Sequence, residues 1–230
     1  MDPMAVSPVI AIILMLAITV ILAGILFCGV SSLSPELYFY VDDPVTTDVT
    51  IGIQGGVTKA IPEVPLGNRI VWKDVYIDIN GDINFEGKEY EFLYYEGNFQ
   101  YCPSNYGWVF HNQDGELSIG DESLTEEGLL DFIVEIFKES GLYENEIPFL
   151  VDRITEEHML SFSKEWASIR YIPVADVDDA IGLETSFDFS IMRRHFVIEE
   201  NNDPIELDKP EFEEVENSGY LIHETAINRV

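Results

Sequence analysis

Residues 5–30 read AVSPVIAIILMLAITVILAGILFCGV, and no side chain in this stretch is charged. At a rise of about 1.5 Å per residue, a helix of this length reaches roughly 39 Å, more than the roughly 30 Å thickness of a bilayer's hydrocarbon core. The stretch is apolar around its whole circumference, unlike a helix that lies with one face on a soluble core. Pro8 falls in the first turn, and Ser7 before it can cap the helix. We predict a hydrophobic helix that spans a membrane or packs among other helices.

Two simpler interpretations of this stretch stay open on hydropathy. A plain single-pass anchor satisfies it equally well. A cleaved secretory signal fits less well, because the run is longer than the apolar part of such a signal and no basic residue stands among residues 1–4.

The order of residues within this stretch resembles the N-terminal segment of archaeal type IV pilin-like proteins. The similarity is carried by three runs in the family's order: Ser7-Pro8-Val9-Ile10, Leu14-Met15 and Ala17 to Ala23. The resemblance implies that a prepilin peptidase removes residues 1–4 as a leader, by cutting between Met4 and Ala5. It also implies that the freed helix stays in the membrane or packs with its copies as a filament core.

The segment before the cut departs from the family's pattern. It lacks the basic residue and the small residue usually found there, and Met4 takes the place of the latter. A start site placed too far downstream and inefficient processing both explain this. No Lys or Arg precedes Lys59, so the positive-inside rule gives no orientation, and the resemblance alone places the rest of the chain outside the cell.

Acidic residues dominate the charge of the chain. It has 43 Asp and Glu against 12 Lys and Arg, a formal net charge of −31 and a pI near 4.1. Such a surface repels nucleic acid and anionic lipid, and it attracts cations. We therefore expect no nucleic-acid partner and an exterior with moderate salt or calcium. Cys28 and Cys102 are expected to be free thiols, because a bridge between them would pull the domain onto the membrane.

Beyond a linker at residues 31–36, alternating apolar residues predict a β-rich domain over residues 37–230 with a single core. The expected strands are 37–41, where a membrane-interface belt is the alternative, and 49–53, 70–79, 90–95, 107–110, 147–151, 160–172 and 183–198, with 220–223 as a last edge strand. Residues 61–66 are expected at an edge or in a loop, and residues 199–216 in a loop.

One helix is expected in the domain. Ser123 to Glu126 has the pattern of a capping box, apolar residues recur at helical spacing from Leu129 to Phe137, and Gly141 supplies a left-handed stop. The fold class is therefore α+β: a long N-terminal hydrophobic helix, then a mostly antiparallel, β-rich domain covered by one helix.

Asp78, Asn80, Asp82 and Glu89 occupy positions 1, 3, 5 and 12 of a calcium-loop pattern, which needs oxygen ligands at this spacing. Ile83 stands where that loop requires glycine, and no flanking helix is evident. A plain turn between two strands is the alternative. Residues 112–122 contain Asp114-Gly115 and Gly120, which predict a tight turn, a short strand and a second turn. A metal there is a weaker alternative.

Enzyme motifs are poorly represented. The four histidines are scattered, and no phosphate loop, zinc-protease helix or nucleophile elbow occurs in the sequence. Arg193 and His195 would share one face of a strand and pair with carboxylates. We expect no enzymatic activity, and an anchored hydrolase is the least favoured hypothesis.

The favoured hypothesis is a pilin-like surface subunit. Its helix would form a homo-oligomer, with Ser7-Pro8-Val9-Ile10 as the assembly motif, in or at the tip of an extracellular filament for adhesion or surface contact. The alternative is a single-pass, membrane-anchored binding domain outside the cell that does not polymerise. Calcium is the only candidate cofactor.

Overall fold

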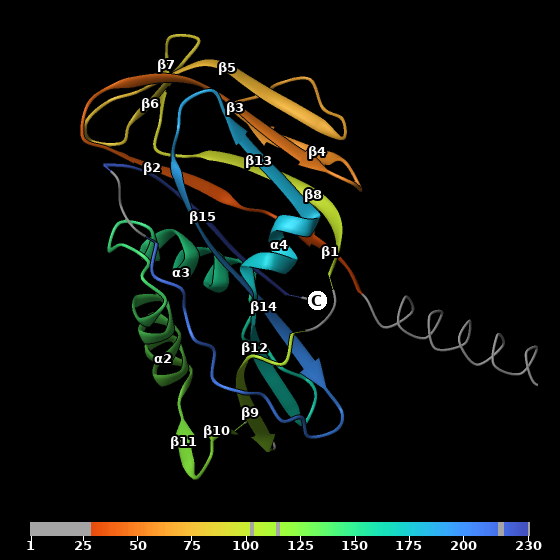
Figure 1. The fold of residues 1–230 in the computed structure, drawn as a ribbon. Coiled ribbons are helices and arrows are strands. Elements are labelled where there is room, and N and C mark those ends of the chain that lie inside the picture. Colours follow the sequence, from red (N-terminus) through yellow and green to blue (C-terminus); the bar gives the residue numbers. More distant parts are fainter. Residues whose placement is uncertain (1–28, 102–103, 114–115, 216–218, 230) are drawn as a thin grey trace, which may run out of the picture.

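The computed structural model describes residues 29–101, 104–113, 116–215 and 219–229, and in them a larger and a smaller β-sheet (Figure 1). The larger sheet has ten strands in the order β1-β8-β2-β15-β14-β12-β9-β10-β11, and β4 pairs with β8 outside this path. These strands are β1 (Gly29–Leu33), β2 (Glu36–Val41), β4 (Val57–Ile61), β8 (Leu93–Tyr101), β9 (Gly107–Gln113), β10 (Glu116–Ile119), β11 (Glu122–Leu124), β12 (Trp166–Ile172), β14 (Ser190–Asn201) and β15 (Tyr220–Arg229).

The smaller sheet has five strands in the order β13-β3-β5-β6-β7 and covers one half of the larger sheet. Its strands are β3 (Val45–Ile53), β5 (Arg69–Ile77), β6 (Ile83–Phe85), β7 (Lys88–Tyr90) and β13 (Ile181–Thr185). The described helices are α2 (Glu126–Glu139), α3 (Ile147–Glu156) and the short α4 (Val174–Ala180).

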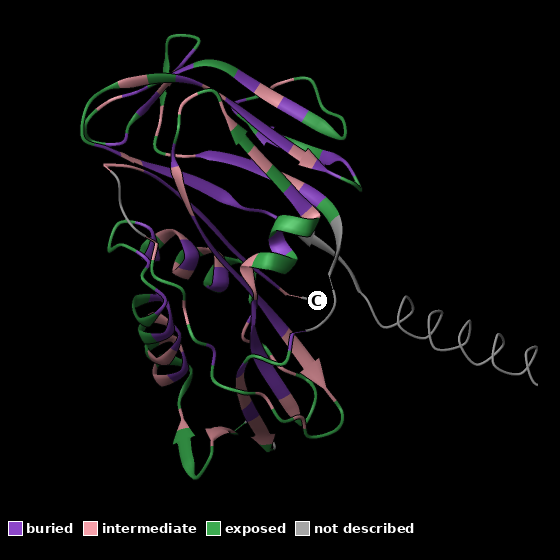
Figure 2. Cartoon of the chain, viewed as in Figure 1, coloured by how far each residue is buried: buried purple, intermediate pink, exposed green. Residues whose placement is uncertain are grey.

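Two apolar cores lie on opposite faces of the larger sheet. The first, between the two sheets, includes Trp72 and Val197; the second, against α2 and α3, includes Phe137 and Phe196. Successive side chains of a strand point to opposite faces, so neighbouring residues of β14 serve different cores. β14 and β15 are buried along most of their length, whereas α2 and α4 carry exposed stretches (Figure 2).

The predicted fold class is wrong. The described chain is dominated by strands, and it has three helices where one covering helix was expected. Among the described helices, none is both long and apolar enough to cross a membrane. Gly29 and Val30, expected at the end of the long helix, lie in β1, which pairs with β8. The rest of the expected helix lies outside the described residues.

Several further elements differ from prediction. The predicted strand 160–172 begins only at Trp166, and the predicted strand 183–198 is divided between β13 and β14, which belong to different sheets. Residues 147–151 form the start of α3, because Ile147, Leu150 and Ile154 bury one helical face, and a short apolar run alone does not distinguish strand from helix. β15 is an interior strand, parallel to β14 on one side and antiparallel to β2 on the other. Residues 220–223 were predicted as an edge strand, so this prediction is wrong.

The helix predicted from residue 123 is α2, and its cap lies two residues later. The Thr125 side chain accepts the Gly128 N–H, so Thr125 is the N-cap and Ser123 belongs to β11. Gly141 has a φ of +89°, the left-handed geometry expected of a helix stop.

Candidate functional site at the junction of the N-terminal segment and the domain

The chain enters the domain through two consecutive strands that both pair with β8. Gly29–Leu33 of β1 pairs antiparallel with Gly97–Tyr101, and Glu36 and Leu37 of β2 pair with Tyr94 and Leu93. β2 also pairs with β15 on its other side, from Glu36 opposite Thr225 onwards. Between them, the Pro35 carbonyl accepts a hydrogen bond from the Tyr95 N–H at 3.2 Å. Pro35 has no N–H to extend the ladder with β15, which suits a position just before that pairing begins at Glu36.

Arg153 of α3 binds the chain where β1 gives way to β2. Its Nη1 donates to the Ser34 carbonyl at 2.8 Å and to Glu36 Oε1 at 3.0 Å, and its Nη2 donates to Asn228 Oδ1 at 3.2 Å. The planar guanidinium can hold several acceptors at fixed angles, which a lysine cannot. One side chain thus joins α3, β15 and the entering segment. We call Ser34, Glu36, Arg153 and Asn228 the junction cluster.

The charge state of the junction cluster depends on burial. Glu36 is fully buried, and burial raises the pKa of its carboxyl to about 8, against the lowering effect of Arg153. Removal of either member would leave a polar or charged group in the protein interior without its partner, so the pair is costly to break. A cavity of about 300 Å³ borders the cluster, between Arg153, Asn228 and Arg229.

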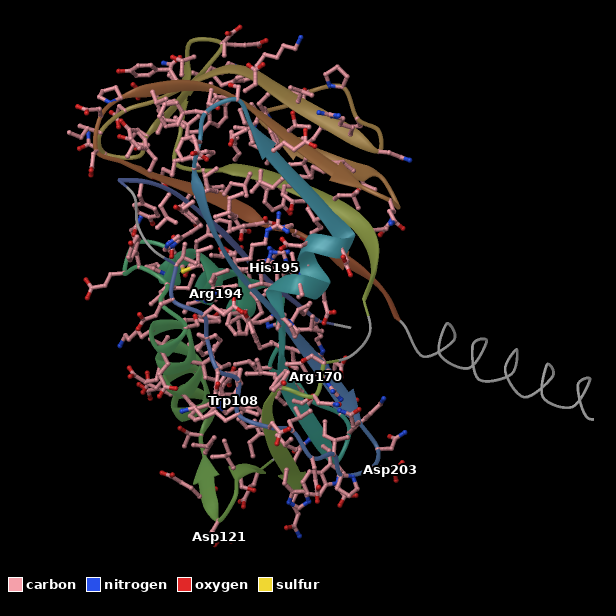
Figure 3. The ribbon with its side chains drawn as sticks, in the orientation of Figure 1. Trp108, Asp121, Arg170, Arg194, His195 and Asp203 are labelled. Atoms are coloured by element: carbon pink, nitrogen blue, oxygen red, sulfur yellow. The ribbon has the colours of Figure 1, made fainter. Side chains whose placement is uncertain are left out.

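A second buried cluster joins strands β8, β14 and β15 within the larger sheet. Arg193 Nε lies 2.9 Å from Glu224 Oε2, His195 Nε2 lies 3.3 Å from Glu224 Oε1, and the Tyr95 hydroxyl donates to that same oxygen at 2.6 Å. Burial alone would raise the pKa of Glu224, but Arg193, His195 and Tyr95 outweigh it and hold the pKa at about 2. Arg193 also reaches Asp178 of α4 at 2.7 Å. Of this cluster, His195 is labelled in Figure 3.

A third buried group holds the start of α3 against the sheet. Glu146, the residue before α3, accepts from the Tyr40 hydroxyl at 2.8 Å and from the Tyr143 N–H at 2.7 Å. His223 Nδ1 lies 2.7 Å from the same carboxylate. Glu146 is fully buried, so these contacts replace the water that it gave up.

These clusters were only partly foreseeable. Arg193 and His195 both contact a carboxylate as predicted, but their shared partner Glu224 is buried, and only Arg193 also reaches an exposed one, Asp178. The junction cluster was missed. One pattern could have indicated it: a charged residue at a position where the apolar repeat predicts burial. Glu36 occupies such a position in β2, and Arg153 occupies one on α3.

The calcium residues fall in and beside the turn between β5 and β6. Asp78 Oδ1 accepts the N–H groups of Asn80 and Asp82, while Glu89 lies in β7 opposite Asn84. Gly81 has a φ of +88°, and a Cβ there would come within 2.3 Å of the Phe39 carbonyl, which explains the displaced glycine. In the described part of the chain no three His, Cys, Asp or Glu are arranged so that they could hold a metal ion. Calcium binding stays a prediction.

The second turn segment lies partly in the described chain. β10 and β11 form a hairpin, and Gly120 between them has a φ of +56°, which fits the predicted strand and glycine turn. Asp114 and Gly115 lie outside the described residues. So do the processing residues Met4 and Ala5, the motif at residues 7–10, and both cysteines.

The sequence comparison bears on the segment that leads into the junction cluster. Residues 4–37 match the family model described as "Archaeal Type IV pilin, N-terminal". No curated protein and no solved structure matches the chain. The matched range includes β1, Ser34 and Glu36, so it ends inside the larger sheet. Over residues 4–37 the chain is therefore similar to the N-terminal segment of the archaeal type IV pilins, as the resemblance in the sequence indicated.

Proposed function

We propose that this chain is an archaeal type IV pilin-like surface subunit that assembles through its N-terminal segment into, or at the tip of, an extracellular filament for adhesion or surface contact. The observation that carries the proposal is the family match over residues 4–37. A prepilin peptidase would cut between Met4 and Ala5. The freed hydrophobic segment would then pack with its copies, or remain in the membrane before assembly.

The junction cluster supports this role. A subunit held in a filament by its N-terminal segment passes any pull on the outer domain through the residues that connect the two. Here the connection is a β1–β8 pairing together with the contacts from Arg153 to Ser34 and Glu36. In this arrangement the domain is attached to the matched segment by a strand in its main sheet.

The test is to shear surface material from cells that produce the chain, sediment it and image it by electron microscopy. We expect the chain in long sedimenting filaments that electron microscopy resolves. Recovery of the chain only after detergent extraction of membranes would contradict polymerisation and would support the anchored, non-polymerising binding domain. Labelling with an antibody to the domain distinguishes a subunit along the filament from one at the tip.

A further inference from the structure

A cavity of about 630 Å³ lies beside the second core, because Tyr171 and Phe212 belong to both. It is open to solvent and is lined by Tyr106, by Tyr171, Pro173 and Val174 of the β12–α4 corner, and by residues 208–213 of the segment that connects β14 to β15. This volume falls in the range of ligand sites, roughly 300–1,000 Å³.

The wall at residues 208–213 is fixed at both ends. The Asp208 carbonyl accepts the Gly107 N–H at 2.9 Å, and the Asp208 N–H donates to the Asn105 carbonyl at 2.8 Å. At the other end, Arg194 Nη2 donates to the Glu213 carbonyl at 2.6 Å. The Phe212 ring between these points packs on Trp108 and lies near the Arg194 guanidinium. The cavity is therefore formed before any ligand binds.

The lining favours a cation. Three acidic residues, Asp208, Glu211 and Glu213, are among those that line it, and the lysine among them, Lys209, lies 2.9 Å from Glu139 Oε2. The Arg194 guanidinium beside Phe212 offsets part of the charge of Glu213. Tyr106 is 43% exposed and offers an aromatic surface beside these carboxylates. Carboxylates and a tyrosine ring are the groups that attract an ammonium or guanidinium.

We propose that this cavity, which we call the strap pocket, binds a lysine or arginine side chain of a basic partner polypeptide. Charge complementarity selects this occupant. The chain's own first 58 residues contain no Lys or Arg, and a second copy offers only 12 Lys and Arg among 43 Asp and Glu. The inference does not depend on filament assembly.

The test is calorimetric titration of the full-length chain, in micelles of a non-ionic detergent, with an end-blocked tetralysine peptide. Two double variants remove equal charge from the same segment: Glu211→Gln with Glu213→Gln inside the pocket, and Asp203→Asn with Glu206→Gln outside it. All four residues are exposed, and Asp203 is labelled in Figure 3. Tyr106→Ala and Tyr106→Phe test the aromatic surface.

We expect the unmodified chain to bind tetralysine saturably. A tetraglutamate peptide should not bind. The pocket double variant should bind about ten-fold more weakly, and the outer double variant within about two-fold of the unmodified chain. Tyr106→Phe should bind normally and Tyr106→Ala more weakly; if Tyr106→Ala does not fold, the two double variants decide. Equal weakening in both double variants would show non-specific attraction and overturn the proposal, as would a lack of saturable binding.

Discussion

Two buried carboxylates, Glu36 and Glu224, differ in the charges around them. Glu224 faces Arg193 and His195 and receives the Tyr95 hydroxyl, so its pKa falls to about 2. Burial raises the pKa of Glu36 to about 8, because the lowering effect of Arg153, its main charged partner, is smaller than the effect of burial. The two residues therefore make stability depend on pH in different ranges.

Replacement of Glu36 by Gln should flatten the pH dependence of stability above pH 4.5. In the folded chain Glu36 keeps a proton that the unfolded chain releases near its ordinary pKa of 4.5. Its contribution is thus complete below pH 4.5 and is lost as the pH rises toward about 8, by an amount on the order of a few kcal/mol. Thermal unfolding of the full-length chain in detergent between pH 5 and 8 measures this slope.

Glu96→Gln is the matched control for this measurement. Burial raises the pKa of Glu96, but Lys59 and Tyr94 outweigh it, so the pKa is lowered and Glu96 titrates below pH 4.5. The slope between pH 5 and 8 should stay unchanged in this variant. Equal slopes in the Glu36→Gln variant and the unmodified chain would contradict the raised pKa.

Arg193 has one buried and one exposed partner, which allows a matched pair of substitutions. Arg193→Met leaves Glu224 as a buried charge with less compensation and should lower the free energy of unfolding by about 3–5 kcal/mol. Asp178→Asn removes only a 60% exposed partner and should cost about 0–1 kcal/mol. Chemical denaturation of both variants checks this, and similar losses would show that the buried pair has no special role.

At the scale of elements, the sequence predicted those with a repeated apolar pattern. β3, β5 and α2 were foreseen because their apolar residues alternate or recur at helical spacing. The start of α3 was predicted as a strand at residues 147–151. The helical repeat of Ile147, Leu150 and Ile154 becomes visible only when the pattern is followed beyond residue 151. β15 was read as a short edge strand, because its buried His223, Glu224 and Asn228 resemble exposed positions until their partners are known.

The N-cap of α2 gives a test at this scale. Thr125→Ala removes the acceptor of the Gly128 N–H and should destabilise the chain by about 1 kcal/mol. Ser123→Ala changes an exposed β11 residue with no capping contact and should stay within about 0.5 kcal/mol. Thermal unfolding compares the stability of the two variants. A larger loss of stability for Ser123→Ala would contradict Thr125 as the N-cap and favour Ser123.

At the scale of the whole molecule, the sequence did not predict the pairing of strands. The larger sheet places β2 beside β15, which is far from it in the chain, and it pairs the consecutive strands β14 and β15 in parallel. Such pairings depend on buried partners, such as Arg193 with Glu224 or Arg153 with Glu36, that no local pattern reveals. The similarity of residues 4–37 to the archaeal type IV pilins was recognisable because it depends on the local order of residues alone.

The central claim is that residues 4–37 act as a pilin segment that is trimmed and then drives assembly. The most direct measurement is the intact mass and N-terminal sequence of the chain in sheared, sedimented surface material. We expect a chain that begins at Ala5 and sediments as a polymer. A product that begins at Met1 and behaves as a single copy in micelles would contradict the claim.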